Sequence, residues 1–238
     1  MKALVVGAAG TIGQACALRL KSDGYDVVAA DLVAPKSASA VAMDVTNQDS
    51  VRSVVDALES EGPLHALVYA AGVNVTGRLD STNWEDYERL MAVNLRGAFY
   101  LGAAIQPHLR KNPRRFGSVF ISSTAGLMGE SGGSVYCASK FGLLGFVESF
   151  AAEIAPLGGR ANSVCPGNVD SPMLTTLAEK IGAREGRGGD TVLADLAASS
   201  AFNRLISPEE VAATCSWLVS PHSSGISGQT IVVDGPNP

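Results

Sequence analysis

A glycine-rich segment near the start of the chain constrains the fold more than any other feature. Gly7, Gly10 and Gly13 follow a short apolar run, residues 3–6, and overlap the start of residues 12–22, whose apolar side chains recur at helical spacing. Glycines between a strand and a helix allow a tight turn and let the backbone approach a phosphate, and the free N–H groups of the helix N-terminus attract anions. The segment therefore predicts an α/β fold with a phosphate-binding loop after its first strand.

Apolar runs and helical patterns alternate along the rest of the chain. Runs typical of strands cover residues 3–6, 26–30, 41–43, 64–70, 117–121, 161–165 and 230–233, and helical patterns cover residues 12–22, 48–60, 83–110, 134–154 and 208–219. The strand runs are continuously apolar, as strands buried on both faces of a parallel sheet require. We expect one domain over residues 1–238: an α/β Rossmann fold with a seven-stranded, mostly parallel sheet and helices on both faces.

Residues 172–206 have the weakest pattern of the chain and contain four glycines. In open α/β sheets, ligands bind beyond the carboxyl ends of the strands. We therefore interpret this stretch as a substrate lid, with residues 174–200 its variable part. A plain surface excursion is the alternative.

Composition excludes several classes of protein. The chain has 238 residues, 46% of them hydrophobic, and a net charge of -5 without a basic block, which argues against disorder and against nucleic-acid binding. No apolar run reaches the ~20 residues that span a bilayer. The four cysteines form no Cys-x-x-Cys pair and the three histidines lie far apart, so we expect no metal site. An apolar run after Lys2 resembles a signal peptide, but glycines interrupt it, and we expect a cytoplasmic protein with reduced cysteines.

An acidic residue stands at the end of the second predicted strand. Asp31 follows Gly13 by 18 residues, which is the position from which a carboxylate accepts the adenosine ribose hydroxyls of a dinucleotide. A helix cap or a solvated loop acid is the alternative. The first cation after Asp31 is Lys36. The absence of a nearer cation favours NAD over NADP.

Tyr136 and Lys140 lie four residues apart on a predicted helix and therefore share a face. A tyrosine hydroxyl has a pKa near ~10, and a neighbouring ammonium lowers it toward the range useful for acid–base catalysis. Ser123 follows the fifth predicted strand, where its hydroxyl could hydrogen-bond a substrate oxygen. Taken alone, a Tyr-x-x-x-Lys pair is a common surface arrangement.

The sequence resembles short-chain dehydrogenases/reductases over nearly its whole length. The matching segments are residues 7–13, Asp44-Val45, Tyr69-Ala70-Ala71-Gly72, Asn94, Ile121-Ser122-Ser123, Tyr136-Cys137-Ala138-Ser139-Lys140, Pro166-Gly167-Asn168-Val169 and Gly228-Gln229-Thr230-Ile231-Val232-Val233-Asp234-Gly235. The family serine precedes the tyrosine by 13 residues, which selects Ser123 over Ser122. The glycine loop departs from the family's commonest form, because Val6 replaces a threonine and Gly10-Thr11 stands where x-Gly is usual.

The resemblance implies a role for each matching residue. Tyr136 is the general acid–base, Lys140 lowers its pKa and binds the nicotinamide ribose, and Ser123 orients the substrate oxygen. Asn94 distorts its helix and holds a water that links Lys140 to solvent. The implied cofactor-binding residues are Gly7, Gly10, Thr11, Ile12, Gly13, Asp31, Asp44, Val45, Ala70, Ala71, Gly72, Tyr136, Lys140, Pro166, Gly167, Val169 and Ser171. Ser171 stands for the usual threonine, and Tyr69 and Ala70 replace two asparagines, which removes a structural hydrogen bond.

These observations together predict an NAD(H)-dependent oxidoreductase that interconverts a secondary alcohol and a ketone. A 3-oxoacyl-carrier-protein reductase is the nearest alternative, which Asp31 opposes because such enzymes usually prefer NADPH. An NAD-binding sensor or scaffold without turnover is the alternative of another class. The substrate itself is not readable. The residues expected around it are Asn74, Val75, Thr124, Glu130, Asn168 and Leu174, while the cations of the lid, Lys180, Arg184 and Arg187, fit a solvated face best.

The helix over residues 134–154 carries more apolar positions than one core-facing stripe uses. The positions concerned are Phe141, Leu144, Phe146, Val147, Phe150 and Ala151. Together with the family resemblance, they predict a homotetramer or homodimer built on the two long helices. The alternative is that all six side chains belong to the core.

Overall fold

The computed structural model describes residues 1–36 and 39–235. Seven strands form one sheet in the order β3-β2-β1-β4-β5-β6-β7, and every neighbouring pair is parallel. The strands are β1 (Lys2–Val6), β2 (Asp26–Asp31), β3 (Ala40–Ala42), β4 (Leu64–Tyr69), β5 (Phe116–Ile121), β6 (Gly159–Pro166) and β7 (Thr230–Val233). The predicted strands therefore agree with the observed ones to within two residues, and the sheet is wholly parallel.

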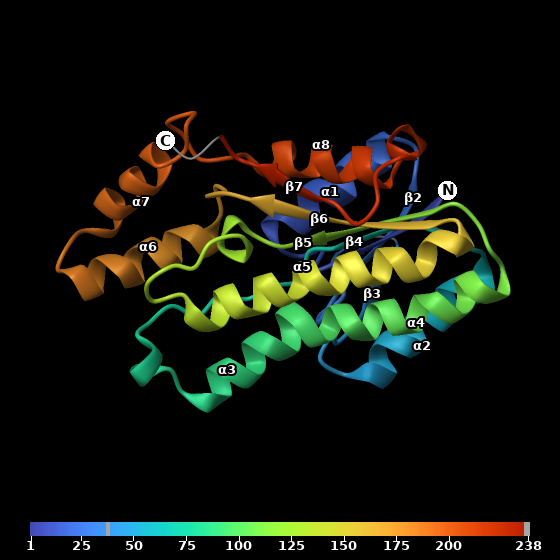
Figure 1. Ribbon diagram of the computed structural model, residues 1–238, viewed down its shortest axis with the longest axis horizontal. Helices are drawn as coiled ribbons and strands as arrows, with labels where there is room; N and C mark the ends of the chain where they lie inside the picture. Colours follow the sequence, from blue (N-terminus) through green and yellow to red (C-terminus); the bar gives the residue numbers. More distant parts are fainter. Residues whose placement is uncertain (37–38, 236–238) are drawn as a thin grey trace.

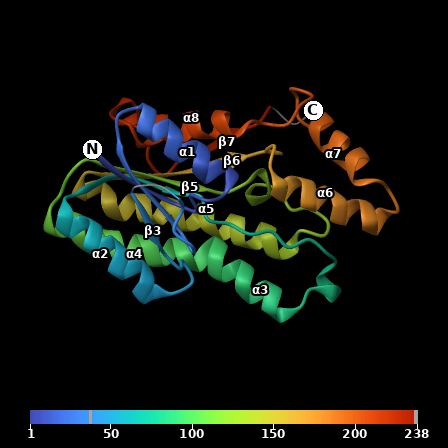
Figure 2. The ribbon, with the colours of Figure 1, turned by 180° about the vertical axis from the view of Figure 1, so that it is seen from behind.

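Helices cover both faces of the sheet and make three layers (Figure 1). The helices are α1 (Thr11–Ser22), α2 (Gln48–Glu61), α3 (Trp84–Met91), α4 (Gly97–Lys111), α5 (Ser134–Ile154), α6 (Pro172–Glu185), α7 (Gly189–Ala198) and α8 (Pro208–Val219). Helices α2, α4 and α5 bury their apolar side chains against one face, and α1 and α8 bury theirs against the other. The view from behind in Figure 2 shows the same two layers around the sheet. The predicted single-domain Rossmann fold is confirmed.

The helical pattern over residues 83–110 is not one regular helix. A π-helical segment, η2 (Ala92–Arg96), separates α3 from α4. Tyr69, at the end of β4, is fully buried and donates a hydrogen bond from its hydroxyl to the carbonyl of Val93 inside this segment. Gly97 makes room for that ring, because a Cβ there would lie 2.4 Å from the Tyr69 hydroxyl oxygen. The tyrosine that replaces a family asparagine thus makes a hydrogen bond of its own.

The stretch of weakest pattern is more ordered than its sequence indicates. It forms a hairpin of the two helices α6 and α7, which lies beyond the carboxyl ends of β6 and β7 (Figure 1). Ser171 caps α6 through a 3.3 Å hydrogen bond from the Leu174 N–H to its hydroxyl. Gly182 lets the turn between the helices close, since a Cβ there would lie 2.6 Å from the Arg187 carbonyl oxygen. The weak pattern reflects a pair of helices in which the buried side chains are few.

The expected apolar surplus of α5 divides between core and surface. Val147, Phe150 and Ala151 are buried in the core, as the alternative interpretation had it. Phe141 remains 45% exposed. Phe146 stacks on Phe150 and is only half-buried. No helix in the described residues is long and apolar enough to cross a membrane.

Candidate active site

The structure brings four residues together at the carboxyl end of the sheet. Ser123 follows β5, Tyr136 and Lys140 project from α5, and Asn94 lies in the π-helical segment. The Lys140 Nζ atom is 5.7 Å from the centre of the Tyr136 ring, and the Ser123 hydroxyl hydrogen-bonds the Tyr136 side chain. A Cβ on Gly72 would lie 3.6 Å from Lys140 Nζ and 3.7 Å from Asn94 Oδ1. The groups that the sequence singled out therefore form one cluster.

Burial dominates the electrostatics of the tyrosine and the lysine. Lys140 is 4% exposed, and burial lowers the pKa of its ammonium to about 8. Burial likewise raises the pKa of Tyr136 to about 12, and the hydrogen bond with Ser123 opposes this shift. The expected lowering of the Tyr136 pKa is thus not a property of the protein groups alone. The phenolate needs a further positive charge nearby.

The lysine is anchored to the sheet. Its Nζ atom donates a 2.9 Å hydrogen bond to the carbonyl of Ile121, the last residue of β5. An ammonium has three donors, so two remain for a ligand or a solvent molecule. Cys165, at the end of β6, lies against the same strand exit: burial raises the pKa of its thiol, and the neighbouring Ser123 N–H and Ser122 side chain oppose this rise. Sequence analysis missed this contact because it joins two strand ends that lie far apart in the chain.

Asn94 is fully buried and fixes the loop after β4. Its side-chain amide exchanges two 2.9 Å hydrogen bonds with the backbone of Val73, and it donates a third, of 3.1 Å, to the Ser139 hydroxyl on α5. The residue thus joins the π-helical segment, the β4 loop and α5. It lies where the resemblance expected a helix distortion.

The three glycines of the first loop have different reasons to be glycine. Gly7 has a φ of +80°, and a Cβ there would lie 2.4 Å from the Ala71 nitrogen at the end of β4. A Cβ on Gly13 would lie 2.0 Å from the Gly7 oxygen, so it lets α1 pack against the loop. Gly10 is exposed, and the only contact of a Cβ there would be the Gly7 oxygen at 3.4 Å. Protein packing therefore does not require glycine at position 10, whereas close approach of a phosphate does.

Asp31 contacts the same loop. Its carboxylate accepts hydrogen bonds from the Ala9 N–H, at 2.9 Å, and from the Leu32 N–H, at 2.8 Å. Each carboxylate oxygen keeps acceptor capacity for a ribose hydroxyl. An open Gly10, the N-terminus of the 12-residue helix α1 and a carboxylate beside the loop fit an adenine dinucleotide.

The other residues that the sequence predicts to bind the cofactor differ in their surroundings. Ala70, Ala71 and Gly72 continue from β4 past the glycine loop, and the Asp44 carboxylate accepts from the N–H and hydroxyl of Thr46. Val45 is buried in the core against Gly97. Residues 166–169 lead from β6 toward α6, and Gly167 leaves room for Asp234, since a Cβ there would lie 2.1 Å from its Oδ2. All of these residues line or support the same edge of the sheet.

Comparison with known proteins supplies the family. A family model described as enoyl-(acyl carrier protein) reductase matches residues 7–235. The short-chain reductase protein NovJ of Streptomyces niveus is 32% identical, over 99% of this chain and 93% of its own length. The 3-oxoacyl-[acyl-carrier-protein] reductase FabG of Thermotoga maritima is 32% identical, over 98% of this chain and 95% of its own.

The chain belongs to the short-chain dehydrogenase/reductase family. The fold agrees, because the NADPH complex of an actinorhodin polyketide ketoreductase variant superposes with a TM-score of 0.89 at 26% identity, over 98% of this chain and 95% of that one. The protein is thus an oxidoreductase of this family, and the family binds nicotinamide cofactors. The residues brought together at the sheet edge are those at which the sequence resembles the family.

Two substitutions in the glycine loop test the different roles of Gly10 and Gly13. Gly10→Ala should leave the free energy of unfolding within about 0.5 kcal/mol of the wild type, as for an ordinary surface change, but should weaken cofactor binding at least several-fold. Gly13→Ala should lower stability by about 1–3 kcal/mol, because overpacking forces α1 away from the loop. Urea denaturation and cofactor titration measure the two effects. A destabilised Gly10→Ala with normal cofactor affinity would contradict this division of roles.

Because Lys140 is buried, we expect its replacement by an uncharged residue to stabilise the folded protein. Lys140→Met should raise the free energy of unfolding at pH 7 by about 1–2 kcal/mol, since each unit of pKa depression is ~1.4 kcal/mol and the lost bond to Ile121 offsets part of it. Above pH 8 the folded protein releases this proton while the unfolded chain keeps it up to about 10.5. Wild-type stability should therefore rise through this window, and the advantage of the variant should shrink. Urea denaturation at pH 7 and pH 10 tests this, with the exposed Lys21→Met as control; a less stable variant at pH 7 would be inconsistent with a buried charge.

Proposed function

We propose that the protein is an NAD(H)-dependent oxidoreductase that interconverts a secondary alcohol and a ketone. The observation that carries the proposal is the contact of Ser123, Tyr136 and Lys140 at the carboxyl end of the sheet, beside the glycine loop of the cofactor. A bound nicotinamide dinucleotide would supply the hydride acceptor in oxidation and the hydride donor in reduction.

The protein groups supply orientation and the proton. Ser123 accepts a 3.2 Å hydrogen bond from the Ala125 N–H, so its own proton is the donor, to Tyr136 in the protein alone and to a substrate oxygen when substrate is bound. Tyr136, next to it, takes the alcohol proton in oxidation and returns it in reduction. Two donors of the Lys140 ammonium are available to the ribose hydroxyls and to a path toward Asn94. The positive charge of the oxidised nicotinamide, together with Lys140, would bring the Tyr136 pKa down from the value that burial imposes.

The carrier-protein reductase remains the second candidate. The similarity to the 3-oxoacyl-[acyl-carrier-protein] reductase FabG favours it. Asp31 favours the first candidate, because its carboxylate lies beside the loop where the 2′-phosphate of NADP would add negative charge. We also propose a cytoplasmic location, because all four cysteines are free, as a reducing compartment keeps them.

The assembly is part of the proposal. Phe99 on α4 is 50% exposed, and its ring lies 4.4 Å from that of Phe146 on α5; Phe141, elsewhere on α5, is 45% exposed. We infer that this surface forms a two-fold contact with a second copy of the chain, as in the dimers and tetramers implied by the family resemblance.

Light scattering tests the assembly. The wild type should have at least twice the 24.5 kDa mass of one chain. Phe141→Glu should shift it toward the single chain, because a charge cannot be buried unpaired in the contact. Leu18→Glu, at a still more exposed apolar position on α1, serves as the control. A wild type of one chain's mass at working concentration would refute the contact.

Removal of the tyrosine hydroxyl tests the catalytic role. Tyr136→Phe should lose at least ~100-fold in kcat, the lower range for a general acid–base group, while its affinity for NAD stays within about two-fold. A panel of secondary alcohols assayed through the nicotinamide absorbance measures this. Tyr100→Phe, a half-buried tyrosine on α4, is the control. Near-normal turnover of Tyr136→Phe would end this mechanism, and NAD binding without turnover of any substrate by the wild type would favour a sensor.

The cofactor preference has its own test. At ~4 Å and an effective dielectric of ~20, like charges repel by ~4 kcal/mol, and salt and side-chain movement reduce this to about 2–3 kcal/mol. NAD should therefore be preferred over NADP by at least ~30-fold in kcat/KM. Asp31→Ser should narrow the gap, by weakening NAD and relieving NADP. Steady-state kinetics with NAD and with NADP, on the wild type and on Asp31→Ser, measures this preference. Equal kcat/KM with the two cofactors in the wild type would favour the carrier-protein reductase instead.

A further inference from the structure

A cleft of about 390 Å³ opens beside the catalytic cluster. Its walls are the loop after β4, helix α3 and helix α6. The lining residues are Val73, Asn74, Thr76, Arg89, Pro172, Met173, Thr176, Leu177 and Lys180. Its volume falls in the ~300–1,000 Å³ range of small-molecule sites.

One contact connects the cleft with the catalytic cluster, and the opposite wall begins next to a residue expected to hold the cofactor. Val73 forms part of its wall, and the side chain of Asn94 holds the Val73 backbone through two hydrogen bonds of 2.9 Å. Pro172, on the opposite wall, directly follows Ser171, the cap of α6. The cleft therefore extends outward from the ends of β4 and β6, on either side of the strand that leads to Ser123.

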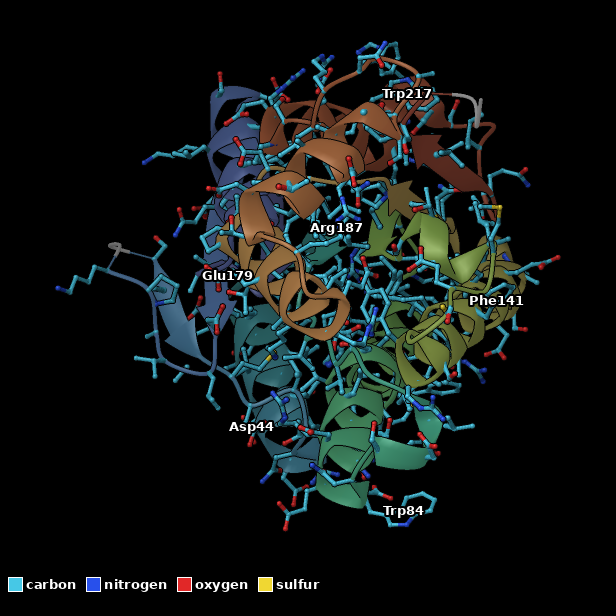
Figure 3. All side chains as sticks on the ribbon, turned by 90° about the vertical axis from the view of Figure 1, so that its left-hand side faces the viewer. Asp44, Trp84, Phe141, Glu179, Arg187 and Trp217 are labelled. Atoms are coloured by element: carbon cyan, nitrogen blue, oxygen red, sulfur yellow. The ribbon has the colours of Figure 1, made fainter. Side chains whose placement is uncertain are left out.

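Lys180 belongs to the face of α6 that lines the cleft. Met173, Thr176 and Leu177 precede it by seven, four and three residues, which places all four side chains on one stripe of the helix. Glu179 faces the other way, because its Cα and Cγ atoms would lie 3.2 Å from a Cβ on Gly189 at the start of α7. Figure 3 shows α6 and α7 side by side, with Glu179 and Arg187 labelled on this hairpin.

The charge of the cleft is opposite to that of the protein. The chain carries a net charge of -5, yet the lining residues include two cations and no carboxylate. Asp86 pairs with Arg89 at 3.1 Å and offsets part of its charge. Lys180 takes part in none of the ion pairs found among the described residues.

The two other cations of the hairpin are already paired. Arg187 forms ion pairs with Asp195 and Glu185. Arg184 lies 3.9 Å from a Glu185 oxygen and packs against Gly132. From the sequence alone, we expected all three cations to lie on a solvated face. The structure distinguishes Lys180 from the other two, because Lys180 lines the cleft.

We propose that this cleft is a subsite for an anionic group, a carboxylate or a phosphate, carried by the substrate, with Lys180 as its principal ligand and Arg89 and the Asn74 amide as supports. The inference rests on the proposed oxidoreductase function and narrows its substrates to alcohols and ketones with a negative charge remote from the reacting carbon. Charge-assisted hydrogen bonds from an ammonium to such groups are stronger than neutral ones.

Binding of simple anions tests the subsite without requiring turnover. Inorganic phosphate and succinate are titrated into the NAD-saturated protein at constant ionic strength and followed by calorimetry. We expect saturable binding to the wild type and a Kd raised about 10-fold in Lys180→Gln. Lys180→Arg should retain most of the affinity, and Lys21→Gln, which removes an equally exposed charge at the end of α1, should retain all of it.

The two anions distinguish the source of the charge. Tighter binding of phosphate indicates a phosphorylated or phosphodiester substrate, and tighter binding of succinate indicates a hydroxy or keto acid. Absence of saturable binding to the wild type, or an equal Kd in Lys180→Gln, overturns the subsite. Neither result bears on Tyr136, so a failure here is distinguishable from a failure of the oxidoreductase assignment.

Discussion

The burial of the Lys140 ammonium is the constraint on which the rest of the site depends. Lys140 is 4% exposed, and this burial lowers the pKa of its ammonium. A hydrogen bond to the carbonyl at the end of β5 holds the ammonium in place. Gly72 lies beside this ammonium and the Asn94 amide, since a Cβ there would be in ordinary van der Waals contact with both. Burial also raises the Tyr136 pKa, and a further positive charge beside the ring would lower it again. Under the proposed function, cofactor binding and proton transfer are coupled for this reason.

The glycine loop depends on backbone segments that approach one another closely. Gly7 meets the end of β4 and Gly13 meets Gly7, so the loop is already folded into its turn by protein contacts. Asp31 holds the loop through the Ala9 N–H while its remaining acceptor capacity faces outward. The carboxylate therefore acts twice, as a support of the loop and as the proposed selector of NAD. The hairpin of α6 and α7, which we propose as the substrate lid, lies beyond the ends of β6 and β7 and contributes the cation of the proposed anion subsite.

The sequence predicted the sheet and the shared position of Tyr136 and Lys140 because both depend on local patterns, whereas Asn94 and the choice of Ser123 came from the family resemblance. Continuous apolar runs marked the strands, and the four-residue spacing of Tyr136 and Lys140 placed both on one face of α5. It could not predict the contacts made between distant segments. The bond from Tyr69 to Val93, the proximity of Cys165 to Ser123 and the cleft beside Lys180 each require two strand ends or helices to be placed in space. The lid helices were missed because their buried side chains are few and glycines interrupt the pattern.

The most direct test of this account is the ionisation of Tyr136 itself. A spectroscopic titration of the tyrosinate absorbance, taken as the difference between the wild type and Tyr136→Phe, gives its pKa with and without oxidised NAD. The account predicts a pKa well above that of a free tyrosine in the protein alone, about 12, and a fall of several units when NAD is bound. A pKa that NAD leaves unchanged, or one already near neutrality without it, would contradict the coupling between burial, cofactor charge and catalysis.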